Sequence, residues 1–141
     1  MKHTKTGNTY IIKVERGENV INTLTDFCKA EGIENGYMRG IGAVEWVSCG
    51  YYELDIKEYH FTEYDEMVEV VSMTGNVALK EGEPFLHVHA LFTNTKNEAF
   101  GGHVAEMRVG VVLEVVLEAL PTKIERELDD EIGLYLMSCG S

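Results

Sequence analysis

The sequence predicts an α+β fold in which a largely antiparallel β-sheet is flanked by one α-helix. Segments rich in β-branched and aromatic residues recur along most of the chain and are separated by short polar turns. Residues 19–31 stand apart, because they show the apolar spacing of an amphipathic helix. The chain has 141 residues, a length typical of one domain, so we expect a single domain over residues 1–141.

The N-terminal quarter is expected to contain a strand and then the helix. Residues 8–15, with the sequence NTYIIKVE, are rich in strand-forming side chains. In residues 19–31 the apolar side chains recur at i, i+1, i+4, i+7 and i+8 from Val20, which places them on one helix face. Gly32 is expected to end the helix, because glycine adopts the left-handed conformation that follows a last helical turn.

The rest of the chain is expected to consist of strands and turns. Residues 37–54 mix strand formers with glycines that indicate bulges. Residues 57–79 predict an edge strand, an acidic turn or short helix and another strand, and residues 81–84 predict a turn. The apolar periodicity of residues 109–120, VGVVLEVVLEAL, fits helix or strand, but the valines and the following Pro121 favour a strand buried on both faces.

The charge of the chain disfavours a nucleic-acid partner. Twenty-four Asp and Glu residues stand against twelve Lys and Arg residues, for a formal net charge of −12. No two basic residues are adjacent, whereas nucleic-acid binders draw much of their affinity from clustered cations. We therefore do not expect direct DNA binding.

The expected location is the cytoplasm. No apolar run approaches the length of about 18 residues that suggests a membrane span, and the N-terminus lacks the apolar core of a signal peptide. Cys28, Cys49 and Cys139 are odd in number and widely spaced, which is typical of reduced thiols rather than of a disulfide framework.

Three of the five histidines lie in residues 85–104, FLHVHALFTNTKNEAFGGHV. In a strand, His87 and His89 point to the same side, opposite a wholly apolar face. If the polar turn that follows centres on Lys96, position 89 pairs with position 103, and His103 stands opposite His89. A slip of one residue would instead turn His103 to the other face.

Three converging imidazoles predict a zinc site of one ion per chain, with His87, His89 and His103 as ligands. Three protein ligands leave a fourth position for water or a small ligand, as in catalytic sites. Glu114, which interrupts the apolar run that follows, is a further candidate as metal ligand or catalytic base. The alternative is that these histidines form only hydrogen bonds on a half-buried strand.

Several segments resemble the plants-and-prokaryotes-conserved (PPC) domain, in the order found in that family. They are GIGAVE, SMTGNVAL, GEPFLHVHALF, AFGGHVAEMRVGVVLEVVL and IERELDDEIGL, and the resemblance covers about residues 8–135. It implies an α+β fold that assembles as a homotrimer. It also implies a metal site, because His87, His89 and His103 match the histidines of the stand-alone prokaryotic type.

The family is also associated with DNA, since stand-alone prokaryotic members are commonly called predicted DNA-binding proteins. In plant members an AT-hook contacts DNA while the PPC domain mediates assembly. This chain has no AT-hook, whose core is a short Arg-Gly-Arg-Pro stretch. The DNA-binding label therefore rests on association rather than on residues of this chain.

Three functions remain open at this stage. The first is a homotrimeric zinc protein that binds a small anionic or carbonyl ligand, with or without catalysis. The second is a DNA-binding regulator, as the family label implies. The third is an assembly module in which zinc is only structural. The residues identify no substrate and no reaction.

Overall fold

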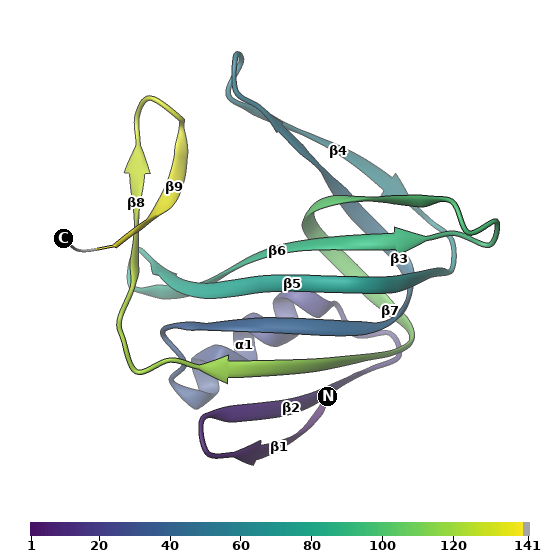
Figure 1. The fold of residues 1–141 in the computed structure, drawn as a ribbon, viewed down its shortest axis with the longest axis horizontal. Coiled ribbons are helices and arrows are strands. Elements are labelled where there is room, and N and C mark those ends of the chain that lie inside the picture. The colour runs from purple at the N-terminus through teal and green to yellow at the C-terminus, as the bar shows by residue number, and fades with distance from the viewer. Residues whose placement is uncertain (140–141) are drawn as a thin grey trace.

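A computed structural model describes residues 1–139 of the chain. This part of the chain forms one helix and nine strands, and Figure 1 shows how they are arranged. In order they are β1 (Lys2–Thr6), β2 (Thr9–Glu15), α1 (Val20–Glu31), β3 (Gly36–Glu53), β4 (Glu58–Tyr64), β5 (Val68–Lys80), β6 (Glu83–Thr93), β7 (Ala99–Ala119), β8 (Glu125–Asp129) and β9 (Leu134–Ser138).

The strands form one nine-stranded sheet whose pairs are antiparallel, apart from a short parallel contact between β5 and β8. β7 lies at its centre and pairs with β2, β3 and β6. β6 also pairs with β5, which in turn pairs with β3. The strands β3, β5, β6 and β7 therefore form a closed ring of pairings. The predicted α+β class with a largely antiparallel sheet is confirmed.

The single described helix lies behind the sheet in the view of Figure 1. It begins one residue later than the predicted start at position 19 and ends where predicted. Gly32 follows in the left-handed conformation, with φ 65°, and its N–H donates a hydrogen bond to a carbonyl of the last turn. The apolar face of the helix is buried, and it packs against β6 and β7.

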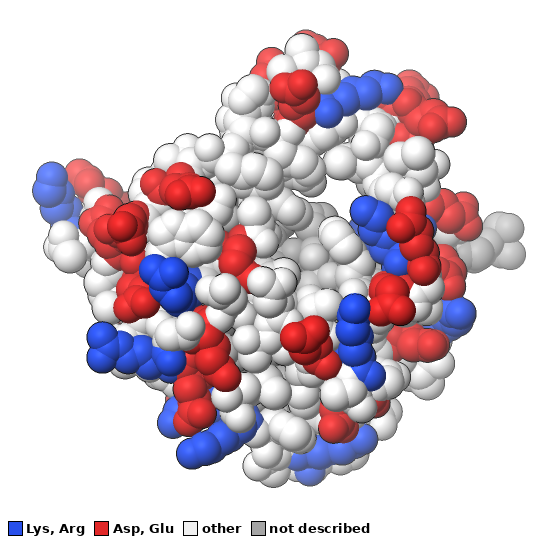
Figure 2. Space-filling view, turned by 180° about the vertical axis from the view of Figure 1, so that it is seen from behind, with Lys and Arg blue, Asp and Glu red and all other residues white. Residues whose placement is uncertain are grey.

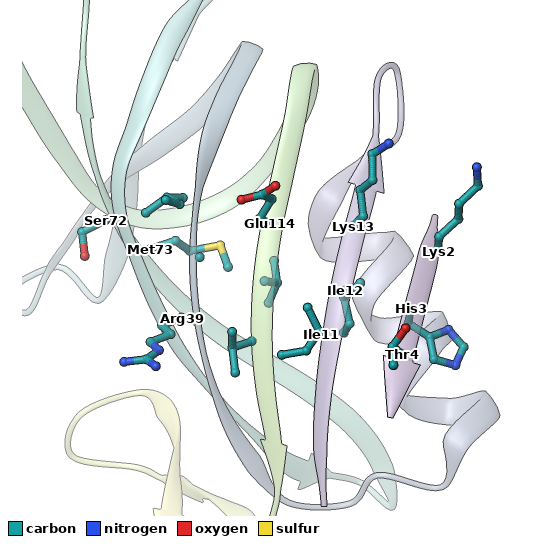
Figure 3. A pocket seen from close by; sticks show the side chains of 14 residues that line it. Lys2, His3, Thr4, Ile11, Ile12, Lys13, Arg39, Ser72, Met73 and Glu114 are labelled. Atoms are coloured by element: carbon teal, nitrogen blue, oxygen red, sulfur yellow. The ribbon is translucent and has the colours of Figure 1, made fainter. Parts of the chain in front are cut away.

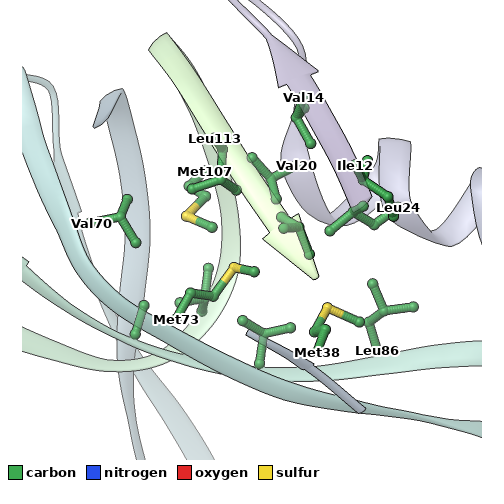
Figure 4. Close-up of a cluster of buried hydrophobic side chains, with 14 of the residues drawn as sticks. Ile12, Val14, Val20, Leu24, Met38, Val70, Met73, Leu86, Met107 and Leu113 are labelled. Atoms are coloured by element: carbon green, nitrogen blue, oxygen red, sulfur yellow. The ribbon is translucent and has the colours of Figure 1, made fainter. Parts of the chain in front are cut away.

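The core fills the space between this helix and the inner face of the sheet. Figure 4 shows side chains from the helix, from β2 and from β3, β5, β6 and β7 converging there. Ile12, Leu24, Met73 and Leu113 are at most 1% exposed. The burial of such side chains, each contributing roughly 1.5–3 kcal/mol, holds the helix on the sheet.

Within one chain, β7 is buried on one face only. Val109, Leu113 and Leu117 are buried, whereas Glu114 is exposed and Val111 is 60% exposed. A single copy therefore does not meet the expectation that residues 109–120 are buried on both faces. The uncovered side is the outer face of the sheet, away from α1.

Two parts of the fold were not predicted. β1 consists wholly of exposed side chains, and β8 with β9 forms an acidic hairpin that projects from the sheet (Figure 1). Neither has a clear apolar alternation to mark it. His3 lies in β1 with its ring edge-on to Phe27, at a centroid distance of 4.9 Å.

In the described residues, no helix combines the length and the apolar character needed to cross a membrane. Cys28, Cys49 and Cys139 form no disulfide, and the first two are buried.

Candidate metal centre

The hairpin of β6 and β7 sets the positions of three histidines. β6 alternates as predicted: Val88 and Ala90 are buried in the core, while His87 and His89 point to the outer side. Across the hairpin, His89 pairs directly with His103. The predicted register is therefore confirmed, and the three imidazoles share one side of the sheet.

Two glycines before His103 allow the strands to approach this closely. A Cβ atom at Gly101 would clash with the carbonyl oxygen of Ala90 on β6, and one at Gly102 would clash with that of Gly50 on β3. Gly102 also has φ 153°, a backbone conformation that other residues rarely adopt. The Gly-Gly-His segment thus brings His103 against β6 and β3 at once.

The distances fit a metal ion held by three imidazoles. One ring nitrogen from each of His87, His89 and His103 lies within 4.8 Å of the others. The Nε2 atoms of His87 and His89 are 3.2 Å apart. Tetrahedral zinc with Zn–N bonds of about 2.05 Å separates its ligand nitrogens by about 3.3 Å. His87 and His89 are therefore already spaced as ligands, and a small movement of His103 completes the set.

The surroundings keep two of these rings neutral. Burial, followed by the neighbouring charges of His89 and Arg126, lowers the pKa of His87. Burial, together with His87 and His89, lowers the pKa of His103 to about 4. A metal ion binds the neutral form of imidazole. Metal binding at neutral pH therefore does not have to displace protons from these two rings.

His103 is the most enclosed of the three. Its Nδ1 atom is buried and has no hydrogen-bond partner within residues 1–139. Its ring packs against Tyr59 of β4, at a centroid distance of 4.8 Å. A buried imidazole nitrogen without a partner is uncommon and often marks a missing ion or water, so this observation agrees with a metal ligand.

A pocket of about 360 Å³ adjoins the histidines. His87 and His103 form part of its wall, and the opposite side is formed by the β8–β9 hairpin. Lys80 and Arg126 also line it. Sequence reasoning missed both cations, because a single Lys at the end of a strand, or a single Arg among the acidic residues of a tail, carries no recognisable signal.

Glu114 does not join the histidines. It lies on β7 opposite Lys13 and Ile41, and it lines a different pocket of about 650 Å³ on the outer face of the sheet. Figure 3 shows this carboxylate in that pocket, with Lys13 and the apolar side chains of β2 on one side of it, and His103 is not among the described residues that line the pocket. The structure therefore gives Glu114 no role at the three-histidine group.

Fold and site together define an α+β protein with an outward-facing group of three histidines able to hold a metal ion. The model of the Plants and Prokaryotes Conserved (PCC) domain, the family also abbreviated PPC, matches residues 1–121. The chain belongs to this family. None of the curated proteins compared with the chain matches it.

Solved structures of the same fold cover almost the whole chain. A plant- and prokaryote-conserved protein from Pyrococcus horikoshii is 37% identical, with a TM-score of 0.88 over 96% of this chain and 94% of its own. A metal-containing protein from Archaeoglobus fulgidus is 30% identical, with a TM-score of 0.87 over 95% of each chain. A protein from Bacteroides thetaiotaomicron, described as a proposed DNA-binding protein, is 26% identical, with a TM-score of 0.94 over 97% of this chain and 96% of its own.

The low pKa of His103 predicts an acid-sensitive fold for the metal-free protein. The unfolded chain takes up this proton near pH 6.5, whereas the folded chain resists it until about pH 4. The unfolded state thus binds more protons between these values, so the free energy of unfolding should fall as the pH is lowered from 6.5 towards 4. Urea unfolding of chelator-treated protein across this range measures the slope.

The variant His103→Asn identifies the source of that slope. It should show a smaller loss of stability over the same pH range, because its side chain does not titrate. An NMR titration of the His103 ring should place its midpoint near 4. Equal slopes for the two proteins, or a midpoint near the ordinary value of about 6.5, would contradict the enclosed, neutral state of this ring.

Proposed function

We propose that this protein is a homotrimeric zinc-binding protein of the PPC family, with one zinc ion per chain and an open coordination position for a small ligand. The observation that carries the proposal is the convergence of His87, His89 and His103, with ring nitrogens within 4.8 Å of one another. Three imidazoles without a fourth protein ligand resemble catalytic or ligand-binding zinc sites more than structural ones.

Two further observations support a bound zinc ion: the description of a similar protein and the preference of zinc for imidazole ligands. The similar protein from Archaeoglobus fulgidus is described as metal-containing. Neutral imidazoles suit zinc among the common divalent ions, whereas magnesium and calcium prefer oxygen ligands. Bound zinc would act as a Lewis acid towards a water molecule or ligand at its open position.

The outer face of the sheet supports a homotrimer. Ile11, Ile41 and Val111 are 51%, 58% and 60% exposed there. Ile11 and Ile41 line the 650 Å³ pocket that also contains Glu114. Exposed apolar side chains beside a hollow of this size favour a contact with another protein, and closed cyclic symmetry is the usual arrangement for identical copies. A second copy covering this face would supply the burial that β7 lacks within one chain.

DNA binding is the second candidate, because similar proteins carry it in their descriptions. The negative net charge of this chain disfavours DNA binding. On the face shown in Figure 2, Lys and Arg are interspersed with Asp and Glu, without a continuous basic stretch. A trimer would have a formal charge of three times −12, or −36, which repels a polyanion. Two positive charges per bound zinc would not reverse this balance.

The third candidate is an assembly module in which zinc only stiffens the hairpin. The backbone pairing of β6 and β7 already fixes the hairpin without a metal, and structural zinc sites usually have four protein ligands. The described residues offer a three-histidine group, so we favour the ligand-binding function.

The metal is tested first. The purified protein, with or without added zinc, should contain about one zinc ion per chain. His103→Ala should weaken zinc binding by at least about 100-fold while leaving the fold intact, because two imidazoles hold the ion far less tightly. Metal analysis and competition with a chromogenic chelator measure both quantities.

His60→Ala is the matched control, because His60 is bonded to Glu53 and takes no part in the three-histidine group. It should bind zinc like the wild type. The proposal is wrong if no metal is found and the variant with all three histidines replaced by alanine titrates zinc as the wild type does.

Assembly is tested by light scattering. The expected mass is three times 15.8 kDa, about 47 kDa, and Ile41→Lys should lower it because a charge would be buried in the contact. Leu54→Lys, at a similarly exposed position in the β3–β4 turn, is the control and should leave the mass unchanged. A wild-type mass near 16 kDa at micromolar concentration excludes the trimer.

For DNA, we expect no duplex binding tighter than about 10 μM at physiological salt, far weaker than a typical specific binder. The few phosphate contacts that scattered cations can make give little affinity and a shallow salt dependence. A fluorescence-polarisation titration measures this. Sub-micromolar affinity that falls steeply with added salt would restore the regulatory function instead.

A further inference from the structure

The pocket beside the three histidines has an unusual charge. Lys80 and Arg126 line it, and its wall contains no Asp or Glu. In the whole chain, acidic residues outnumber basic ones by twenty-four to twelve. A wall with two cations and no carboxylate is therefore the reverse of the overall composition, and it favours an anion.

Arg126 is the central residue of this pocket. Its side chain is buried, with 7% exposure, and no described carboxylate forms an ion pair with it. Two neutral oxygens hold it in place: Nη1 donates to the carbonyl of Tyr135 at 3.1 Å and Nη2 donates to Asn76 at 2.6 Å. Three of the five guanidinium donors remain, and Nε is buried without a partner.

Nothing else in the pocket neutralises this charge. Burial raises the pKa of Tyr59, and the hydrogen bond to Glu81 raises that of Tyr135, so both phenols are uncharged at neutral pH. Lys80 packs over the ring of Tyr135 at 4.2 Å and adds a second cation. A buried guanidinium without a counter-ion is costly, and an anion from outside the chain would offset that cost.

We propose that this pocket binds a small organic oxyanion, a carboxylate or a phosphate, between the metal and Arg126. Such a molecule would place its anionic group on Arg126 and Lys80 and an oxygen on the open position of the metal. The pocket of about 360 Å³ has room for a small metabolite but not for a polymer. Planar guanidinium recognises both anions in the same bidentate way.

This inference rests on the proposed zinc site, and four probes test it on the full-length protein. They are lactate and inorganic phosphate as oxyanions, lactamide as the uncharged analogue of lactate, and zinc alone. Cobalt(II) in place of zinc reports ligands at the metal through its visible spectrum, and calorimetry gives the affinities. Tighter binding of lactate than of phosphate would identify a carboxylate ligand, and the reverse order a phosphate.

Arg126→Met should weaken lactate or phosphate binding by at least about 10-fold, because it removes a charge-assisted hydrogen bond. Zinc affinity should change by less than about threefold, and any weak binding of lactamide should not depend on Arg126. Arg16→Met, at an exposed position outside the pocket, is the matched control and should behave as the wild type.

Lys80→Met covers the case in which loss of Arg126 disturbs the fold, because it leaves both hydrogen bonds of Arg126 in place. It should weaken oxyanion binding by about threefold or more, as expected for removal of one partly exposed charge. The Arg126 Nε–H signal in a nitrogen-15 NMR spectrum should also shift when phosphate is added to metal-free protein.

The outcomes separate this inference from the zinc proposal. If the protein binds no metal but phosphate still shifts the Arg126 signal, the zinc proposal fails and the anion pocket stands. If zinc binds but neither oxyanion binds at about 10 mM, a concentration that detects even weak ligands, the pocket inference is wrong. It is also wrong if Arg126→Met dissociates the assembly while the wild type binds no oxyanion, because Arg126 then pairs with a second copy of the chain.

Discussion

Strand β7 must pair with three different strands along its 21 residues, and the rest of the structure depends on how it does so. Its C-terminal half lies between β2 and β3, where Leu113 and Leu117 point into the core. Its N-terminal half lies between β3 and β6 and carries His103. Shifts in the register of β3 against β7 allow this change of partners. Because one strand serves both purposes, the pairing that stabilises the core also fixes the third imidazole opposite His89.

The electrostatics of the site follow from its position on the sheet. The rings of His87 and His103 are partly enclosed by β4 and by the β8–β9 hairpin, so the loss of water favours their neutral form. The same enclosure surrounds Arg126, whose charge has no partner among the described residues. A metal ion binds neutral ring nitrogens such as those of His87 and His103. An anion binds a guanidinium that no carboxylate neutralises, such as that of Arg126. Metal and ligand are thus favoured by the same enclosed surface.

The sequence predicted the parts of this arrangement that are local. Alternation along residues 85–92 and a polar turn were enough to place His89 opposite His103, because a hairpin fixes register through its turn. The apolar period and Gly32 were enough for α1. β1 and the β8–β9 hairpin were missed because their exposed faces leave little periodicity. Arg126 was missed because its contact with Asn76 spans 50 positions, and no local pattern encodes such a contact.

The residues that line the pocket come from two parts of the chain, and only one of these parts lies within the match to the family model. The family model matches residues 1–121, which include all three histidines and Lys80. Arg126 and the β9 residues that face it lie beyond that match. The three histidines therefore lie within the part of the chain that the family model matches, whereas Arg126 lies beyond it, in a hairpin that similar solved structures also cover in large part. The β8–β9 hairpin joins the sheet through a short parallel pairing with β5 and through hydrogen bonds with Tyr52, Lys57 and Asn76, and in the described part of the chain it forms no ladder with β6 or β7. A label shared by the family therefore does not by itself decide which ligand this chain binds, because a shared fold does not fix the side chains that line the pocket.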